Sequence, residues 1–357
     1  MLAYAVRTPG GEYTVRVRRG ALEEVGACVP AKSGKVFVVS TADVWRIHGA
    51  AFTAGMEGRE FELLEFPGGE ERKRFAEVEA LAERMVDLGG DRTSLVIAFG
   101  GGIVNDLGGF LAAIFMRGIP VVQVPTTLLA QVDAGVGGKT GVNLVSGKNL
   151  VGAFHQPVAV LIDPDLLATL PDREYRAGLA EVIKCGIIRD EPLFRLLAER
   201  YEAVQKRDPG LVEQSIATSV RIKCEVVSAD EKEGGLRKIL NFGHTIGHAL
   251  EAETGYARFL HGEAVALGMR AAVNLSHLTG YLSAEDGVDM LECINLYGPW
   301  PSARDLTPEQ VFRHVRKDKK TLRGAVHFVL ASRIGQTEVV SGIDDRIVLE
   351  ALGKALA

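Results

Sequence analysis

The stretch that decides the fold is L-V-I-A-F-G-G-G-I-V-N-D, which runs from Leu95 to Asp106. Its apolar, β-branched beginning predicts a buried strand, and the strand breaks into three adjacent glycines. We expect a helix to begin at the acidic residue that follows, Asp106. Glycine lets a backbone approach a pyrophosphate closely, and the N–H groups of a helix start attract anions. The adjacent glycines differ from the spaced G-x-G-x-x-G fingerprint, so alone they also fit a plain tight α/β turn.

Strands and helices alternate on both sides of this stretch. Amphipathic helices are expected at Phe75–Leu88 and Leu107–Met116. Such alternation predicts a mostly parallel sheet with both faces covered, in an α/β Rossmann-like domain. The predicted strands are Thr14–Val17, Lys35–Ser40, Phe61–Phe66, Leu95–Phe99, Val121–Pro125 and Ala159–Asp163.

The pattern becomes helical after Pro171, so we expect a domain boundary within Thr169–Asp172. Residues 1–170 would form the α/β domain, and residues 171–357 would form a mainly α-helical domain. A small hairpin is expected in the second domain at Ala325–Leu330 and Thr337–Val340. The predicted helices are Tyr175–Ile188, Leu193–Gln205, Leu211–Ala229, Thr245–Glu253, Ala264–Leu278, Ala284–Leu296 and Glu309–Val315.

Composition narrows the class of protein. The 357 residues are 47% hydrophobic and 24% charged, which is typical of a soluble globular chain with a large core. The net charge of −5 argues against a general nucleic-acid surface, and we expect no nucleic-acid partner. No leader segment or membrane span is expected. The four cysteines lack C-x-x-C spacing, which fits reduced thiols in the cytoplasm.

A glycine-rich segment follows the strand that ends at Pro125. Gly135–Gly141 alternates glycine with lysine and threonine, and Gly147-Lys148-Asn149 follows shortly after. We interpret this segment as a flexible anion cradle, with a solvated surface loop as the alternative. The density of glycine favours the cradle, because glycine is costly in entropy unless a close approach or an unusual backbone conformation requires it.

Four side chains suggest a metal site. His244 and His248 are four residues apart and share one face of a predicted helix. His261 stands at the expected start of the next helix, and Glu181 precedes Lys184 by one turn. A catalytic zinc takes three nitrogen or oxygen ligands and leaves one position open. Spacing alone leaves open which three of the four residues serve, and the histidine pair could also be structural.

Together these motifs resemble the 3-dehydroquinate synthase family of sugar phosphate cyclases. The resemblance extends from Phe66-Pro67-Gly68-Gly69-Glu70 to Arg316–Lys320, and its most specific segments are Arg117–Pro157, Gly178–Lys184 and Glu233–Glu263. It implies a homodimer, with an N-terminal NAD-binding α/β domain and a helical C-terminal domain that binds metal and substrate.

Carried over position by position, the resemblance implies the metal ligands Glu181, His244 and His261, with Zn²⁺ or Co²⁺ as the ion. It assigns His248 to the substrate instead. The residues implied for NAD are Gly68, Gly69, Glu70, Glu71, Arg72, Lys73, Gly102, Ile103, Val104, Asn105, Asp106, Thr126, Thr127, Lys139, Lys148, Leu166, Leu167, Ala168 and Thr169.

The implied reaction converts 3-deoxy-D-arabino-heptulosonate 7-phosphate to 3-dehydroquinate and phosphate, in the shikimate pathway to chorismate and the aromatic amino acids. It proceeds by transient NAD-dependent oxidation, phosphate elimination, reduction and intramolecular aldol closure. Lysine and arginine suit a substrate that carries a carboxylate and a phosphate. The implied catalytic and substrate residues are Asp133, Lys139, Asn149, Lys184, Lys223, Arg237, Asn241, His248, Lys319 and Arg117, the last reaching the other subunit, with Lys320 as a further basic residue.

The chain departs from the family pattern at Thr41, at Cys185 and at Ala134-Gly135, and three rival functions remain. Thr41 stands where the family usually has an acidic residue for the adenine ribose, with Asp43 nearby. Another sugar phosphate cyclase is the first rival, although the pair Gly247-His248 favours a dehydroquinate synthase. A metal- and NAD-dependent polyol dehydrogenase is the second rival, although Glu181 and the anion-binding lysines argue against it. A binding protein without activity is the third, and the complete set of motif residues disfavours it.

Overall fold

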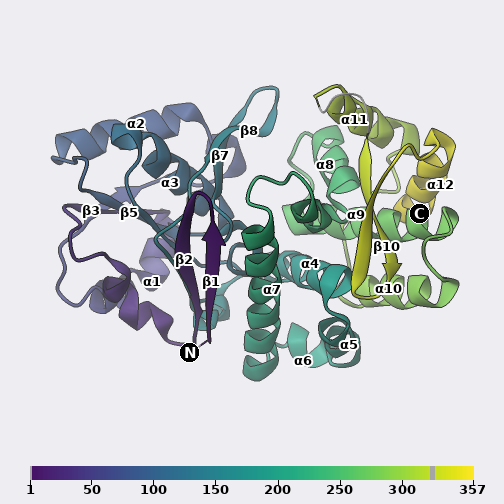
Figure 1. Ribbon diagram of the computed structural model, residues 1–357, viewed down its shortest axis with the longest axis horizontal. Helices are drawn as coiled ribbons and strands as arrows, with labels where there is room; N and C mark the ends of the chain where they lie inside the picture. The colour runs from purple at the N-terminus through teal and green to yellow at the C-terminus, as the bar shows by residue number, and fades with distance from the viewer. Residues whose placement is uncertain (1, 322–325) are drawn as a thin grey trace. The chain divides into compact units, whose positions relative to one another are not determined.

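The computed structural model describes residues 2–321 and 326–357, and side chains throughout these ranges except at residues 317–321. The chain divides into two compact units. The first comprises the residues up to Pro171 together with Ile216–Lys232, and the second comprises Asp172–Ser215 and Glu233–Ala357. The first unit has an α/β Rossmann-like fold and the second is mainly helical, as the sequence predicts (Figure 1).

The first unit is built on a seven-stranded sheet in the order β1-β2-β9-β6-β5-β3-β4. β1 runs antiparallel to β2, and the other neighbours are parallel. All six residues of β5 are buried, which accounts for its continuous apolar sequence. The strands are β1 Leu2–Thr8, β2 Gly11–Val17, β3 Val36–Ser40, β4 Glu62–Glu65, β5 Leu95–Gly100, β6 Val121–Pro125 and β9 Ala159–Ile162.

Helices cover both faces of this sheet, with α2 Phe75–Asp87 and α3 Gly102–Ile114 on one face and α1 Ala42–Gly55 on the other (Figure 1). Alternate residues of each strand supply the two cores. Val96 and Ala98 pack toward α2 and α3, whereas Ile97 and Phe99 pack toward α1. The two-residue period of a strand therefore divides one apolar run between two helical layers.

The start of α3 corrects one prediction. The helix begins at Gly102, directly after the N-cap Gly101, so Asp106 lies one turn inside it and does not open it. No acidic side chain stands in the described first turn. This matters because a carboxylate there would compete with an incoming anion for the exposed N–H groups.

The glycine-rich segment is a second correction, because from Lys139 onward it forms a β-hairpin and not a flexible loop. β7 Lys139–Leu144 pairs antiparallel with β8 Gly147–Phe154. A Cβ on Gly141 would lie 2.6 Å from the Val151 carbonyl oxygen, and one on Gly152 would lie 2.0 Å from that of Thr140. Glycine is needed here because the two backbones approach too closely for any side chain.

The second unit is organised around α9, His261–Leu278, which packs against α4, α8, α10, α12 and β10. The expected hairpin is present as β10 and β11, although Ala325 lies outside the described residues. The other elements are α4 Asp172–Arg189, α5 Glu191–Glu199, α6 Tyr201–Gln205, α8 His244–Glu253, α10 Ala284–Leu296, α11 Pro308–Thr321, α12 Asp345–Leu356, β10 His327–Arg333 and β11 Gln336–Ser341.

Helix α7, Pro209–Ala229, begins in the second unit, and from Ile216 onward its residues belong to the first. Just beyond its end, Glu231 is buried and accepts three hydrogen bonds within the first unit. These come from Thr8 Oγ1 at 3.0 Å, the Gly10 amide at 3.2 Å and Gln156 Nε2 at 2.8 Å. Glu231 thus connects the segment that follows α7 to the turn between β1 and β2.

Four further features differ from the predicted ones. The sequence pattern did not indicate β1, α1 or α12, and the single helix expected at Leu193–Gln205 is broken into α5 and α6 at Arg200. Only Val6 of the edge strand β1 is fully buried, so the strand lacks a clear apolar alternation. No helix within residues 2–321 and 326–357 is both long and apolar enough to span a bilayer.

Candidate functional site

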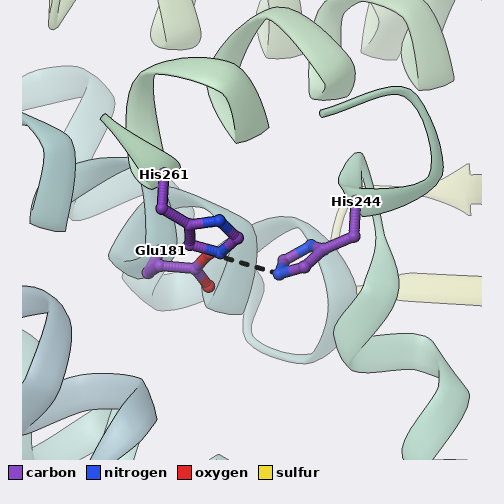
Figure 2. Close-up of side chains that lie close together, drawn as sticks. All are labelled: Glu181, His244 and His261. Atoms are coloured by element: carbon purple, nitrogen blue, oxygen red, sulfur yellow. Dashed lines mark ion pairs between the residues drawn. The ribbon is translucent and has the colours of Figure 1, made fainter. Parts of the chain in front are cut away.

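Three side chains from three helices meet in the second unit (Figure 2). Glu181 lies within α4, and His244 and His261 are the first residues of α8 and α9. Glu181 Oε1 is 3.5 Å from His244 Nε2 and 3.7 Å from His261 Nε2. One donor atom from each residue lies within 4.8 Å of the others, and the two nitrogens with one oxygen form a donor set that suits zinc.

The environment of Glu181 suits the binding of a cation. The residue is 1% exposed, and neither carboxylate oxygen accepts a hydrogen bond from any described residue. Lys184, one turn along α4, forms an ion pair with Oε2. A buried carboxylate is costly unless its lone pairs are satisfied, and a metal ion bound by Oε1 and the two histidines would satisfy them.

Close helix packing makes this meeting possible. A Cβ on Gly262 would lie 1.8 Å from the carbonyl oxygen of Ala177, so α9 begins against the backbone of α4. Gly243, with φ of 80°, precedes α8, and its Cβ would lie 2.9 Å from the Val265 carbonyl oxygen. Glycine at these two positions lets α9 approach α4 and lets the start of α8 approach α9, which brings the three side chains close together.

His248 is one helical turn from His244 but belongs to a different group of donors. Its ring centre lies 5.4 Å from that of His244 and 5.8 Å from that of His261. A second cluster unites it with Glu251 and His261. His248 is exposed, whereas His244 is buried, so the two histidines that share a helix face have different environments.

Two cationic candidates accompany these ligands in the same unit. Lys184 and Arg237 are each 1% exposed. Arg237 lies in the short helical segment Leu236–Asn241, and the amide of Asn241 donates to Glu233 Oε1 at 2.5 Å. Lys184 pairs with the Glu181 carboxylate, and Arg237 supplies a second buried cationic group in the same unit.

The first unit gathers a second set of predicted residues. Lys73 Nζ lies 2.5 Å from Asp106 Oδ2 and 2.6 Å from Asn149 Oδ1. Burial raises the pKa of Asp106, and the nearby Lys73 ammonium opposes that rise. Asn149 has a φ of 52°, and its amide donates to Asn143 Oδ1. Lys73 thus joins α3 to the β7–β8 hairpin.

Two residues that are distant in sequence also meet in this unit. Lys223, in the part of α7 that belongs to the first unit, donates to both the backbone oxygen and Oδ1 of Asp133. Both distances are 2.5 Å, and Lys223 is buried. A buried lysine held by two oxygens in this way has a fixed position.

The glycine turn ends beside the threonines that follow β6. The Thr126 amide donates to the Gly100 carbonyl at 2.9 Å, and a Cβ on Gly101 would lie 3.0 Å from Thr127 Cγ2. These residues lie at the carboxyl ends of β5 and β6, where parallel sheets bind ligands. The narrow space that glycine leaves at an uncapped helix start fits a pyrophosphate.

Residues 63–177 match the family described as 3-dehydroquinate synthase N-terminal, and residues 178–321 match the one described as 3-dehydroquinate synthase C-terminal. The chain belongs to the 3-dehydroquinate synthase family. A curated relative named 3-dehydroquinate synthase, from Solibacter usitatus, is 61% identical over 100% of both chains.

Solved structures of other sugar phosphate cyclases share the fold of this 3-dehydroquinate synthase family member. The 2-epi-5-epi-valiolone synthase of Streptomyces hygroscopicus, with NAD⁺ and Zn²⁺ bound, has a TM-score of 0.86 at 28% identity, covering 98% of both chains. A 2-deoxy-scyllo-inosose synthase complexed with carbaglucose-6-phosphate, NAD⁺ and Co²⁺ has a TM-score of 0.87 at 25% identity, covering 98% of this chain and 99% of that one.

The other residues carried over from the 3-dehydroquinate synthase family differ in their burial. Arg117 and Lys139 are exposed, and the side chain of Lys319 lies outside the described residues. The side chains of Leu166 and Leu167 are buried, so these residues would contact a cofactor through their backbone atoms. Lys148 Nζ lies 4.0 Å from Glu70 Oε2, which links two of the predicted NAD residues.

The departure at Thr41 has a local structural effect. Thr41 is the N-cap residue of α1, and its hydroxyl donates to Asp43 Oδ1. Asp43 therefore brings a carboxylate next to the position where the 3-dehydroquinate synthase family usually has an acidic residue.

Sequence reasoning missed Glu251, which is 1% exposed and lies near His248 and His261. A signal was present, because His244, His248 and Glu251 follow one another at helical spacing on α8. The motif was interpreted through its histidines, and the acidic residue one turn later received no role.

We expect Lys73→Met to destabilise the protein by about 2–3 kcal/mol at neutral pH, because it leaves the largely buried Asp106 carboxylate without its cation. Burial raises the pKa of Asp106 even with Lys73 beside it, so removing Lys73 raises that pKa further above its unfolded value. A carboxyl whose pKa is raised in the folded state contributes stability at low pH that is lost as pH rises. The loss of stability in Lys73→Met relative to wild type should therefore become smaller as pH falls toward about 4. Urea unfolding at several pH values measures this.

Lys35→Met is the matched control, because Lys35 is an exposed lysine of the same unit that contacts only the Leu88 carbonyl in the described hydrogen bonds. It should change stability little at any pH. Equal, pH-independent losses in the two variants would contradict a charge role for Lys73.

Proposed function

We propose that the protein is a 3-dehydroquinate synthase, converting 3-deoxy-D-arabino-heptulosonate 7-phosphate to 3-dehydroquinate and inorganic phosphate. The observation that carries the proposal is the cluster of Glu181, His244 and His261, with the buried cations Lys184 and Arg237 in the same unit. Membership of the family, at 61% identity to a relative of that name, supports the same reaction. The protein is thus a carbon–oxygen lyase that eliminates phosphate.

NAD and a divalent metal ion are the proposed cofactors. Structural neighbours are bound to NAD⁺ with Zn²⁺ or Co²⁺. In this chain the metal ligands would be Glu181, His244 and His261, and NAD would lie at the glycine turn before α3. When bound, NAD accepts and later returns a hydride, and the metal ion stabilises negative charge on substrate oxygens.

The chain's own residues then bind and orient the substrate. We assign Lys184 and Arg237 to its anionic groups, because a buried ammonium and a buried guanidinium bind carboxylate or phosphate strongly once water is excluded. His248 is exposed next to the metal cluster, so its imidazole can move a proton to or from a bound ligand.

In the first unit, Lys223 and Asp133 form a fixed ion pair that can exchange for contacts with the substrate. Asn149, held by Lys73, offers its amide close to Asp106 on the predicted NAD side. These groups position charge and supply no covalent step, which suits a reaction whose leaving group is already a good one.

The assembly and location are further proposals. We infer two domains, residues 1–170 for NAD and residues 171–357 for metal and substrate, with residues 216–232 of the latter range packing in the first unit. We also infer a cytoplasmic homodimer. The exposed Arg117, with φ of 71°, supports a role toward a partner copy. No disulfide joins the cysteines, all of which lie in the described chain and are buried, and this supports a reducing compartment.

We expect purified, metal-loaded protein with NAD to release inorganic phosphate from 3-deoxy-D-arabino-heptulosonate 7-phosphate without accumulating NADH. The reaction is redox-neutral overall, because the hydride removed from the substrate is returned to it. A phosphate assay run beside absorbance at the NADH wavelength measures both quantities, and the product is identified as 3-dehydroquinate.

Two outcomes would contradict the proposal. Phosphate release only from another sugar phosphate would assign the protein to another cyclase reaction. NADH accumulation from an uncharged polyol, without phosphate release, would indicate a dehydrogenase instead.

A further inference from the structure

Glu251 contacts the metal cluster from the side opposite Glu181. It lies near the end of α8, is 1% exposed, and its Oε2 is 3.5 Å from His261 Nδ1. The other ring nitrogen, Nε2, is 3.7 Å from Glu181 Oε1. The His261 imidazole is therefore flanked by two buried carboxylates, one at each nitrogen.

The two sides of this ring have different chemical requirements. A neutral imidazole carries one proton, and the nitrogen that binds a metal ion must be the one without it. If Nε2 faces the metal site beside Glu181, the proton stands on Nδ1, which faces Glu251. A carboxylate is an acceptor for that N–H, and such outer partners fix the ring orientation and raise the basicity of the ligand.

We propose that Glu251 is a positioning residue that holds His261 in the Nδ1–H tautomer and presents Nε2 to the metal ion. The inference rests on the proposed function, because it needs the metal site of Glu181, His244 and His261. Glu251 itself touches neither substrate nor metal in this role. Its effect passes through the ring of His261.

The second histidine of the cluster has its own partner of a different kind. His244 Nδ1 lies 3.3 Å from the Phe242 carbonyl oxygen, two residues before it. The His244 side chain is 10% exposed and that of His261 is 30% exposed. The more exposed ring is less restrained by packing, so His261 depends more on a side-chain partner.

The backbone that carries His261 is already fixed by another carboxylate. Glu263 accepts a hydrogen bond from the Leu260 amide at 2.8 Å and a forked pair from Arg173 at 2.7 and 2.8 Å. These contacts hold the start of α9 on α4 but do not reach the imidazole. Glu251 contacts the ring itself, at Nδ1, and is placed to restrain its rotation.

The test compares zinc affinity of the wild-type protein, Glu251→Gln and Glu253→Gln by competition with a chromophoric chelator. Glu253 is the matched control, because it lies on the same helix and its Oε2 contacts a different histidine, His314 Nε2, at 2.8 Å. We expect Glu251→Gln to weaken zinc binding about 10- to 100-fold and Glu253→Gln to leave it unchanged. The melting temperature of the zinc-free proteins should be similar.

Equal zinc affinities in wild type and Glu251→Gln would overturn the inference. So would the loss of a second equivalent of zinc in that variant, because Glu251 would then be a metal ligand itself. His244→Ala separates this inference from the proposed function. If that variant loses zinc and Glu251→Gln does not, only the positioning role fails, whereas zinc binding unaffected by His244→Ala would contradict the metal site itself.

A measurement on the unmutated protein covers the case in which Glu251→Gln does not fold. Nitrogen-15 spectra of the histidine-labelled, zinc-loaded protein distinguish a protonated Nδ1 from a protonated Nε2. We expect His261 to carry its proton on Nδ1. Zinc on Nδ1, with the proton on Nε2, would overturn the inference without any substitution.

Discussion

Replacing His261 with alanine is expected to remove tightly bound metal and to lower turnover by about 10³- to 10⁴-fold, because a metal ion contributes several kcal/mol of charge stabilisation. The variant leaves Glu181 and His244 as the remaining members of the cluster. Two ligands hold zinc poorly, since catalytic sites use three protein ligands. Metal content after dialysis and phosphate release together measure the effect.

His277→Ala is the matched control, because His277 lies on the same helix and its ring contacts the Leu282 carbonyl at 3.3 Å, away from the cluster. It should retain metal and activity. Full metal content in His261→Ala would remove His261 from the ligand set, and with it the assignment of Glu251.

Arg237→Ala is expected to raise KM for the sugar phosphate by about 100- to 1000-fold, since truncating a buried, hydrogen-bonded charge costs about 3–4 kcal/mol. Arg237 is 1% exposed, so water cannot replace the lost guanidinium easily. Its planar fork suits a carboxylate or phosphate. Steady-state kinetics measured by phosphate release would separate KM from kcat.

Arg237→Lys tests the geometry, because it keeps the charge and loses the fork. We expect it to recover only part of the affinity. Arg258→Ala removes an exposed arginine of the same unit, paired with Asp305, and should leave KM unchanged. A normal KM in Arg237→Ala would exclude the proposed contact with substrate.

The sheet was predictable because its strands are buried on both faces. Val36–Ser40, Leu95–Gly100 and Val121–Pro125 are buried at every position, which gives continuous apolar runs between turn residues. The predicted strands therefore agree with the observed ones to within a few residues. Burial on both faces makes such segments visible in a single sequence.

The elements that were missed are those whose stability comes from their neighbours. Helix α1 buries only Gly49, Phe52 and Gly55 along its length, so no broad apolar stripe marks it. In the β7–β8 hairpin, Gly141 and Gly152 allow the backbones to meet, but glycine alone equally fits a loop. Tertiary contacts decide both cases, and these are not encoded in local periodicity.

The candidate site was predictable in composition but not in grouping. Spacing places His244 and His248 on one helix face, and it cannot tell that Glu181 of another helix approaches the first and not the second. Nor can it indicate that Lys223 meets Asp133, or that Glu251 lies at His261. These pairings depend on how helices pack. The family resemblance implied the grouping of Glu181 with His244 and His261, but neither of these last two pairings.

The contacts of Glu231 impose an order on synthesis of the chain. Strand β2 cannot pair with β9 until the ribosome has synthesised the chain to Ile162. The hydrogen bonds between the turn after β1 and Glu231 can form only later still, after residue 231 has been synthesised. Contacts between residues so distant in sequence slow folding, because a long loop must close first. On the ribosome, the amino-terminal unit therefore stays unfinished until residue 232 has emerged, when part of the helical unit has already been translated.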